Sequence, residues 1–142
     1  KLVNMKQYKI KLLVFGGRHF NDYERATEVL DFNLQNYTKD EILIIQGDAS
    51  GADALGKRYA IDNGIDHQDY PAEWDNLDVE PCVIKYNKFG KPYNAVAGHN
   101  RNKSMGDEAT HGIGFWDQKS TGTLNMKKYL TKLGKPHKMF LY

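Results

Sequence analysis

Short apolar runs alternate with longer stretches in which apolar residues recur every three or four positions. The apolar runs predict buried strands at residues 10–15, 42–45, 112–116 and 138–142, and a more polar edge strand at 65–70. The stretches between them predict helices that begin near residues 22, 51, 98 and 121. This alternation is typical of α/β proteins, so we expect a three-layer α/β sandwich with a mainly parallel five-stranded sheet.

Three of the predicted strands run directly into turns that are rich in glycine or hydroxyl residues. These turns lie at residues 16–18, 47–53 and 120–123. One strand order consistent with right-handed crossovers is 3-2-1-4-5, which places the first and fourth strands side by side where the winding reverses. Glycine lets backbone N–H groups approach a ligand, and the helix behind each turn favours negative charge. The pattern therefore predicts a pocket for a phosphate-bearing molecule at the carboxyl edge of the sheet.

Residues 71–97 form a long stretch without a helix or strand pattern, interrupted by proline and glycine. Irregular segments of this length inside a compact domain are uncommon and are often functional lids. The aromatic side chains of Tyr86, Phe89 and Tyr93 could close over a planar ligand or pack against the core. Trp74 could likewise stack on a base or anchor the loop. We predict that this segment gates the pocket.

Composition narrows the class of protein. The 142 residues are 40% hydrophobic, and 20 basic against 18 acidic residues give a net charge of +2 without a basic block. One domain with its own core fits this length, and the balanced charge argues against nonspecific nucleic-acid binding. A single cysteine and the lack of an apolar run long enough to span a membrane favour a cytoplasmic protein. Residues 1–4 precede Met5 and are expected to be a cloning remnant, which assigns the domain to residues 5–142.

Several charged side chains in the turns have both a binding and a structural interpretation. Arg18, with His19 beside it, could hold phosphate or carboxylate through its planar guanidinium, or could pair with Asp22 on the surface. Asp53 could meet a ribose hydroxyl or cap the following helix. Asp117 ends a strand and could contact a hydroxyl, act as an acid or base, or only form the turn.

The third turn offers hydroxyl groups and free N–H groups at a helix start. Ser120 and Thr123 could therefore bind phosphate or only cap the helix. The second turn is no Walker P-loop, because no Gly-Lys-Ser or Gly-Lys-Thr follows its glycine, and the chain lacks GxGxxG, which weakens an NAD-binding interpretation. The five histidines lack the spacing of metal ligands. We predict neither a metal site nor a cofactor.

Five short motifs follow one another along nearly the whole chain. They read GGRxFxD from Gly16, GxAxGAD from Gly47, PAxW from Pro71, AGxxRN-x-x-M from Ala97 and FWDxxSxGT from Phe115. In this order they resemble the YspA-like branch of the SLOG superfamily, whose Rossmann-like domains are related to the Lonely Guy phosphoribohydrolases and the Smf/DprA proteins. The resemblance implies a Rossmann-like fold and a pocket for a nucleotide or nucleotide-derived ligand.

The turns and the resemblance together give a set of expected ligand contacts. Arg101 and Asn102 enter it through the resemblance, which favours a pair facing an anion or a base over a merely solvated helix face. The expected ligand-binding residues are Gly16, Gly17, Arg18, His19, Gly47, Ala49, Gly51, Asp53, Trp74, Arg101, Asn102, Asp117, Ser120, Gly122 and Thr123.

One departure from the family bears on catalysis. The Lonely Guy hydrolases carry GGxGTxxE with a catalytic glutamate, whereas Met126 stands at that position here and cannot transfer a proton. We therefore expect a protein that binds a nucleotide-derived ligand, such as an ADP-ribose-like molecule, as a sensor or sequestering protein of a bacterium or phage. An N-glycosidase or phosphoribohydrolase acting on a nucleoside monophosphate, with Asp53 or Asp117 as the substitute carboxylate, is the alternative.

A DNA-binding module is a third interpretation, disfavoured by the balanced charge. The expected partner is thus a nucleotide-derived small molecule rather than a membrane or a nucleic acid. Formation of a homo-oligomer through an exposed surface stays open.

Overall fold

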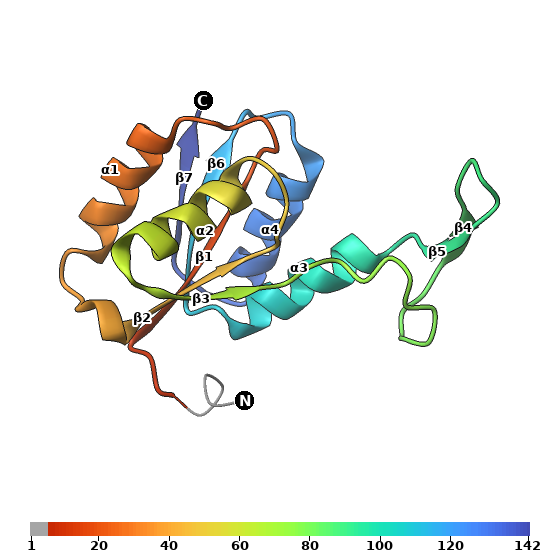
Figure 1. The fold of residues 1–142 in the computed structure, drawn as a ribbon, viewed down its shortest axis with the longest axis horizontal. Helices are drawn as coiled ribbons and strands as arrows, with labels where there is room; N and C mark the ends of the chain where they lie inside the picture. Colours follow the sequence, from red (N-terminus) through yellow and green to blue (C-terminus); the bar gives the residue numbers. More distant parts are fainter. Residues whose placement is uncertain (1–5) are drawn as a thin grey trace.

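Five parallel strands form the centre of the fold, in the order β3-β2-β1-β6-β7 (Figure 1). The strands are β1 (Ile10–Gly16), β2 (Ile42–Gln46), β3 (Asp66–Asp69), β6 (His111–Trp116) and β7 (His137–Leu141). The computed structural model describes residues 6–142, so the expectation for residues 1–4 lies outside the described residues. The predicted α/β sandwich and the predicted strand order are confirmed.

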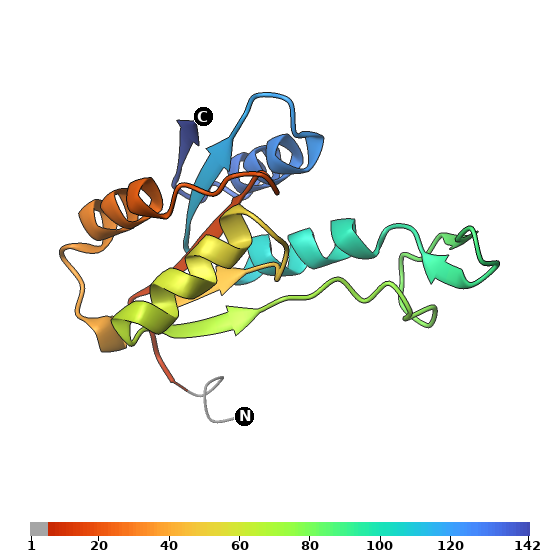
Figure 2. The ribbon, with the colours of Figure 1, turned by 45° about the horizontal axis from the view of Figure 1, so that its top comes forward.

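Two helices cover each face of the sheet (Figures 1 and 2). They are α1 (Tyr23–Leu34), α2 (Ala52–Asn63), α3 (Ala97–Glu108) and α4 (Thr121–Lys132). Along β1, Leu12 and Val14 pack against α1 and α2, whereas Leu13 and Phe15 pack against α3 and α4. A strand buried on both faces is apolar at every position, which explains its continuous hydrophobic run. Within residues 6–142, each helix is too short or too polar to cross a membrane.

Local signals in the sequence set the ends of the helices. Asp22 caps α1 by accepting a hydrogen bond from the Arg25 N–H at 3.0 Å. Gly64 ends α2 in the left-handed conformation, with φ of 64°, which glycine adopts without strain. A short 3₁₀ turn, η2 (Lys39–Glu41), precedes β2 and was not predicted by the hydrophobic pattern.

The segment between β3 and α3 differs from its prediction. Instead of remaining irregular throughout, it contains β4 (Ile84–Tyr86) and β5 (Pro92–Asn94), which pair as an antiparallel hairpin. We call residues 71–96 the arm, because they project from the body of the fold in both views (Figures 1 and 2). The hairpin has no periodic signature because its strands span three residues each, and β4 is exposed throughout.

Candidate functional site

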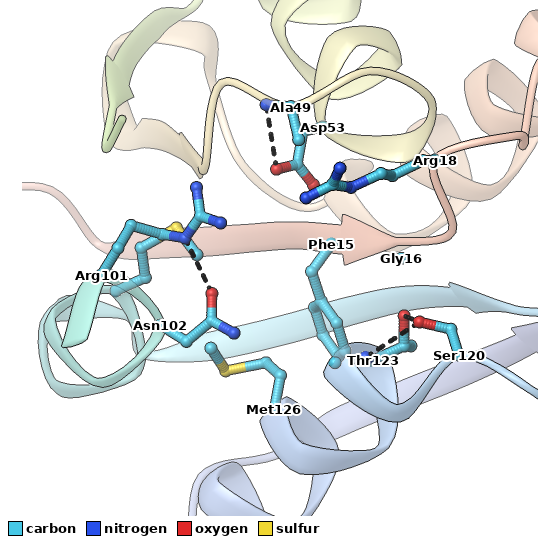
Figure 3. Close-up of a pocket in the computed structure, with 12 residues that line it drawn as sticks. Phe15, Gly16, Arg18, Ala49, Asp53, Arg101, Asn102, Ser120, Thr123 and Met126 are labelled. Carbon is cyan, nitrogen blue, oxygen red and sulfur yellow. Dashed lines mark hydrogen bonds between the residues drawn. The ribbon is translucent and has the colours of Figure 1, made fainter. Parts of the chain in front are cut away.

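The three turns predicted to meet at the carboxyl edge of the sheet line one pocket of about 120 Å³ (Figure 3). The lining residues are Phe15, Gly16, Arg18, Ala49, Asp53, Arg101, Asn102, Met105, Ser120, Gly122, Thr123 and Met126. They come from the ends of β1 and β2 and from the helices α2, α3 and α4 that follow. Phe15, Met105 and Met126 are almost fully buried and give the pocket an apolar floor, which the turn motifs alone did not indicate.

A second hollow of about 270 Å³ adjoins this pocket and shares Arg18, Ala49 and Arg101 with it. It extends over the β2–α2 turn to Trp74 at the base of the arm. Trp74 is 44% exposed, and one edge of its indole ring lies toward Gly98. Because each hollow is smaller than the ~300 Å³ of a typical small-molecule site, a nucleotide-sized ligand would need both.

Arg101 fastens α3 to the ends of two strands. Its Nη1 donates to the backbone carbonyls of Gly47, after β2, and of Tyr70, after β3, the latter at 3.2 Å. Its Nε donates to the Asn102 side chain at 2.9 Å. Burial lowers the pKa of Arg101 from its usual value, while the charge of the Asp53 carboxylate opposes that shift. The guanidinium is therefore largely engaged with the protein itself.

Asp53 holds the β2–α2 turn closed from its interior. Only 7% exposed, it accepts hydrogen bonds at Oδ2 from the N–H groups of Gly47 at 3.1 Å and Ala49 at 3.4 Å. Burial raises the pKa of Asp53 to about 6, although both hydrogen bonds and the Arg101 and Arg18 charges act to lower it. The cap position of α2 is taken by Gly51, without a side-chain hydrogen bond, so Asp53 stabilises the turn rather than the helix end.

Glycine is required at position 47 by the side chains on either side of it. A Cβ atom there would lie 2.6 Å from Arg101 Nη1 and 2.7 Å from Asp53 Oδ2. Both of those atoms are fixed by hydrogen bonds to the turn. Gly47 thus allows an arginine and an aspartate to meet around one backbone segment.

The start of α4 forms the opposite side of the pocket, and Arg18 enters the pocket from the turn after β1. Ser120 caps α4: its Oγ accepts from the Thr123 N–H at 3.3 Å and lies 2.9 Å from Thr123 Oγ1. The N–H groups of Thr121 and Gly122 belong to the first turn of the helix, which has no intrahelical acceptors for them. Within residues 6–142 the Arg18 guanidinium makes no hydrogen bond or ion pair, and Figure 3 shows it extending toward Asp53. These donors and the positive end of the helix dipole suit an anion.

Comparison with known proteins supports the family suggested by the motifs. Residues 10–76 match the sequence model of the YspA, cpYpsA-related SLOG family. This stretch of the chain belongs to the SLOG family. A search of curated proteins found no significant match.

Among solved structures, this chain is similar to DNA processing protein A (DprA) from Streptococcus pneumoniae. The TM-score is 0.65 at 19% sequence identity, which shows a common fold. The similarity covers 93% of this chain but only 50% of that protein, so the chain spans half the length of the DNA-processing protein.

Not all residues expected at the pocket line it. Gly17 and Gly51 instead bring the first two turns together: Ala52 N–H donates to the Gly17 carbonyl at 3.1 Å, and a Cβ on Gly51 would lie 2.2 Å from that oxygen. Gly51 also has φ of +77°, which favours glycine. His19 is exposed and lies outside both hollows.

Asp117 also lies outside both hollows. Its Oδ1 accepts hydrogen bonds from the N–H groups of Lys119 and Ser120, each at 2.8 Å. These bonds lower the pKa of Asp117, which keeps its carboxylate ionised within the turn. Within residues 6–142, no group of three histidine, cysteine, aspartate or glutamate side chains could hold a metal ion.

Proposed function

We propose that this SLOG protein binds a nucleotide-derived ligand across the two adjoining hollows, with a phosphate at the start of α4. The observation that carries the proposal is that Arg18 and the first turn of α4 line one pocket with hydrogen-bond donors that have no partner within residues 6–142. A dianionic phosphate complements both the helix dipole and an arginine fork. The space beside Gly122 is open to a phosphate, because a Cβ built on Gly122 has no atom within 4 Å.

The sugar and the base of a nucleotide fit the groups that line the pocket and the second hollow near the β2–α2 turn. Asp53 has Oδ2 bonded to the turn, which leaves Oδ1 as an acceptor for a sugar hydroxyl. Trp74 is 44% exposed and lines the second hollow, where a base could stack on its indole ring. The order phosphate, sugar and base then runs from α4 past Asp53 to the base of the arm.

Binding without turnover is the role that we favour. At the position of the catalytic glutamate of the resembling hydrolases, Met126 is 2% exposed and forms part of the apolar floor. A thioether cannot accept or donate a proton in a hydrolytic step. The protein would then sense or sequester a signalling nucleotide of the ADP-ribose type and return it intact.

Calorimetric titration with AMP, ADP and ADP-ribose tests the phosphate contact. We expect Arg18→Ala to weaken the affinity of the best of these ligands by about 1.5–3 kcal/mol, since a charged hydrogen bond is lost. Its melting temperature should stay unchanged because the exposed side chain has no protein partner in residues 6–142. Arg58→Ala is the matched control, because Arg58 is an exposed arginine of α2 outside both hollows. Equal affinities of the Arg18 and Arg58 variants would contradict the assignment.

One observation favours a second function, hydrolysis of a nucleoside monophosphate. The pKa of Asp53, raised to about 6, is close to the value that suits a general acid or base at neutral pH. Chromatography of candidate nucleotides after incubation with catalytic amounts of protein separates the two roles. Recovery of intact ligand supports binding, whereas several turnovers to base and ribose phosphate that Asp53→Asn abolishes would establish the hydrolase.

A further inference from the structure

The two edges of the β4–β5 hairpin differ in their free hydrogen-bonding groups. The Val83 carbonyl accepts from Ala95 N–H at 2.7 Å, and Asn87 N–H donates to the Lys91 carbonyl at 2.9 Å. Residues alternate in the direction of their backbone groups along an antiparallel pair, so those at 83, 85 and 87 face β5. The N–H and C=O groups of Ile84 and Tyr86, on β4, therefore point away from the hairpin.

The outer edge of β5 is closed. Pro92 has no N–H to offer, and the Asn94 N–H already donates to the Trp74 carbonyl at 2.7 Å. Only the β4 edge of the hairpin can therefore accept a further strand. An isolated two-stranded hairpin is marginally stable in water, and a third strand removes that weakness.

Apolar side chains surround the open edge. Val83, Ile84, Tyr86 and Phe89 are 46%, 51%, 68% and 83% exposed. They lie on the arm, which projects from the body of the fold (Figures 1 and 2). Exposed apolar groups gathered beside an unpaired strand edge are typical of a protein interface.

The charges of the arm point to a second copy of this chain as its partner. Residues 73–80 at the base carry four acidic and no basic residues, whereas residues 81–98 carry three lysines and no acidic residue. Lys91 already pairs with Asp75 of its own arm at 3.4 Å, which leaves Lys85 and Lys88 for a second arm. Two arms that lie antiparallel bring these lysines of each copy toward the acidic base of the other. A nucleic-acid strand along the arm would instead meet four carboxylates at its base.

We propose that β4 pairs antiparallel with β4 of a second copy about a two-fold axis, which makes a four-stranded sheet from two arms. An axis at Lys85 would place two lysines directly opposite each other, which is unfavourable. An axis at Ile84 instead pairs Ile84 with itself. By residue count, Lys88, in the hairpin turn just beyond β4, then corresponds to Glu80 of the other copy, in the bend before Pro81. The interface is isologous and closed, so it yields a dimer rather than a filament.

Exchange of the charges at position 88 and position 80 tests the pairing in the full chain. Sedimentation velocity should give a dimer for the unchanged protein and a dissociation constant raised about tenfold or more for Lys88→Glu and for Glu80→Lys. An equimolar mixture of the two variants should regain the affinity, because each variant tip then meets a base of opposite charge. Lys128→Glu, on α4, is the control and should leave the dimer unchanged.

A variant of the backbone tests the open edge independently of charge. Tyr86→Pro removes an N–H that faces away from β5, so the hairpin keeps its internal bonds and the melting temperature should hold. We expect this variant to be monomeric while it retains full affinity for nucleotides, which separates this inference from the proposed function. A monomer at millimolar concentration of the unchanged protein would overturn the pairing. Binding of a single-stranded oligonucleotide that Lys88→Glu abolishes would also overturn it.

Discussion

The two sides of the pocket differ in how far their polar groups are already bonded within the protein. On the β2–α2 side, Arg101 donates to Gly47, Tyr70 and Asn102, and Asp53 accepts from two N–H groups of the turn. On the α4 side, the N–H groups of Thr121 and Gly122 have no intrahelical acceptor. Arg18, which extends from the turn after β1 toward Asp53, also has no hydrogen-bonded partner within residues 6–142. Two arginines line the pocket, and their different bonding indicates that Arg101 builds the pocket while Arg18 is left for a ligand.

This contrast separates stability from binding. Removing a group that is bonded within the protein leaves buried partners unsatisfied and destabilises the fold. Removing a group that has no partner within the protein and binds only the ligand lowers the affinity and leaves the stability of the fold unchanged. Substitutions on the two sides should therefore give opposite signatures when stability and affinity are measured on the same samples.

The largest effect is expected from Arg101→Ala. It removes charged hydrogen bonds to two backbone carbonyls and one side chain, and it leaves the buried Asp53 without its positive neighbour. We expect the free energy of unfolding to fall by about 4 kcal/mol, measured by urea denaturation. A fall below about 1 kcal/mol together with lost nucleotide affinity would instead make Arg101 a ligand contact.

Asp53 should make stability depend on pH. Burial raises its pKa from 3.8 to about 6, so between these values the folded protein holds the proton more tightly than the unfolded chain. The free energy of unfolding should therefore fall by about 3 kcal/mol as pH rises through that window and then level off. Asp53→Asn should lose this slope, because the amide oxygen still accepts from the turn but carries no charge. Parallel slopes for the two proteins between pH 4 and 7 would remove the buried carboxyl from the explanation.

The same substitution, glycine to alanine, can be made on each side of the pocket and its effect on stability compared. Gly47→Ala places a methyl group against Arg101 Nη1 and Asp53 Oδ2, and we expect it to destabilise the protein by about 2 kcal/mol. Gly122→Ala meets open space in the first turn of α4, so its stability should change by less than about 0.5 kcal/mol. Thermal denaturation of both variants measures the difference, and equal melting temperatures would contradict it.

The fold was predictable because burial on both faces of a sheet forces apolar residues at every position of its strands. The three pocket turns were predictable for a related reason: each ends such a strand with glycine or hydroxyl residues. The hairpin of the arm was not, since strands of three residues that bury no common face leave no periodic signal.

The sequence could not predict that Arg101 bonds within the protein while Arg18 is left for a ligand. Arg101 and Gly47 are 54 positions apart, and the partners of Arg101 just after β2 and β3 are backbone carbonyls, which every residue has. Nothing in the local sequence distinguishes an arginine that bonds such carbonyls from one that faces a ligand. Similarly, the choice of Asp53 between the turn and the helix cap depends on the closeness of Gly47 and Ala49 in space.

Amide chemical shifts in a phosphate titration test most directly which side of the pocket receives the anion. With ¹⁵N-labelled protein and added AMP, with sodium phosphate as a second probe, the N–H signals of Thr121 and Gly122 should move progressively and saturate. Those of Gly47 and Ala49, already bonded to Asp53, should move far less. Saturable shifts of Gly47 and Ala49 with unmoved signals for Thr121 and Gly122 would contradict the assignment of the phosphate to the start of α4.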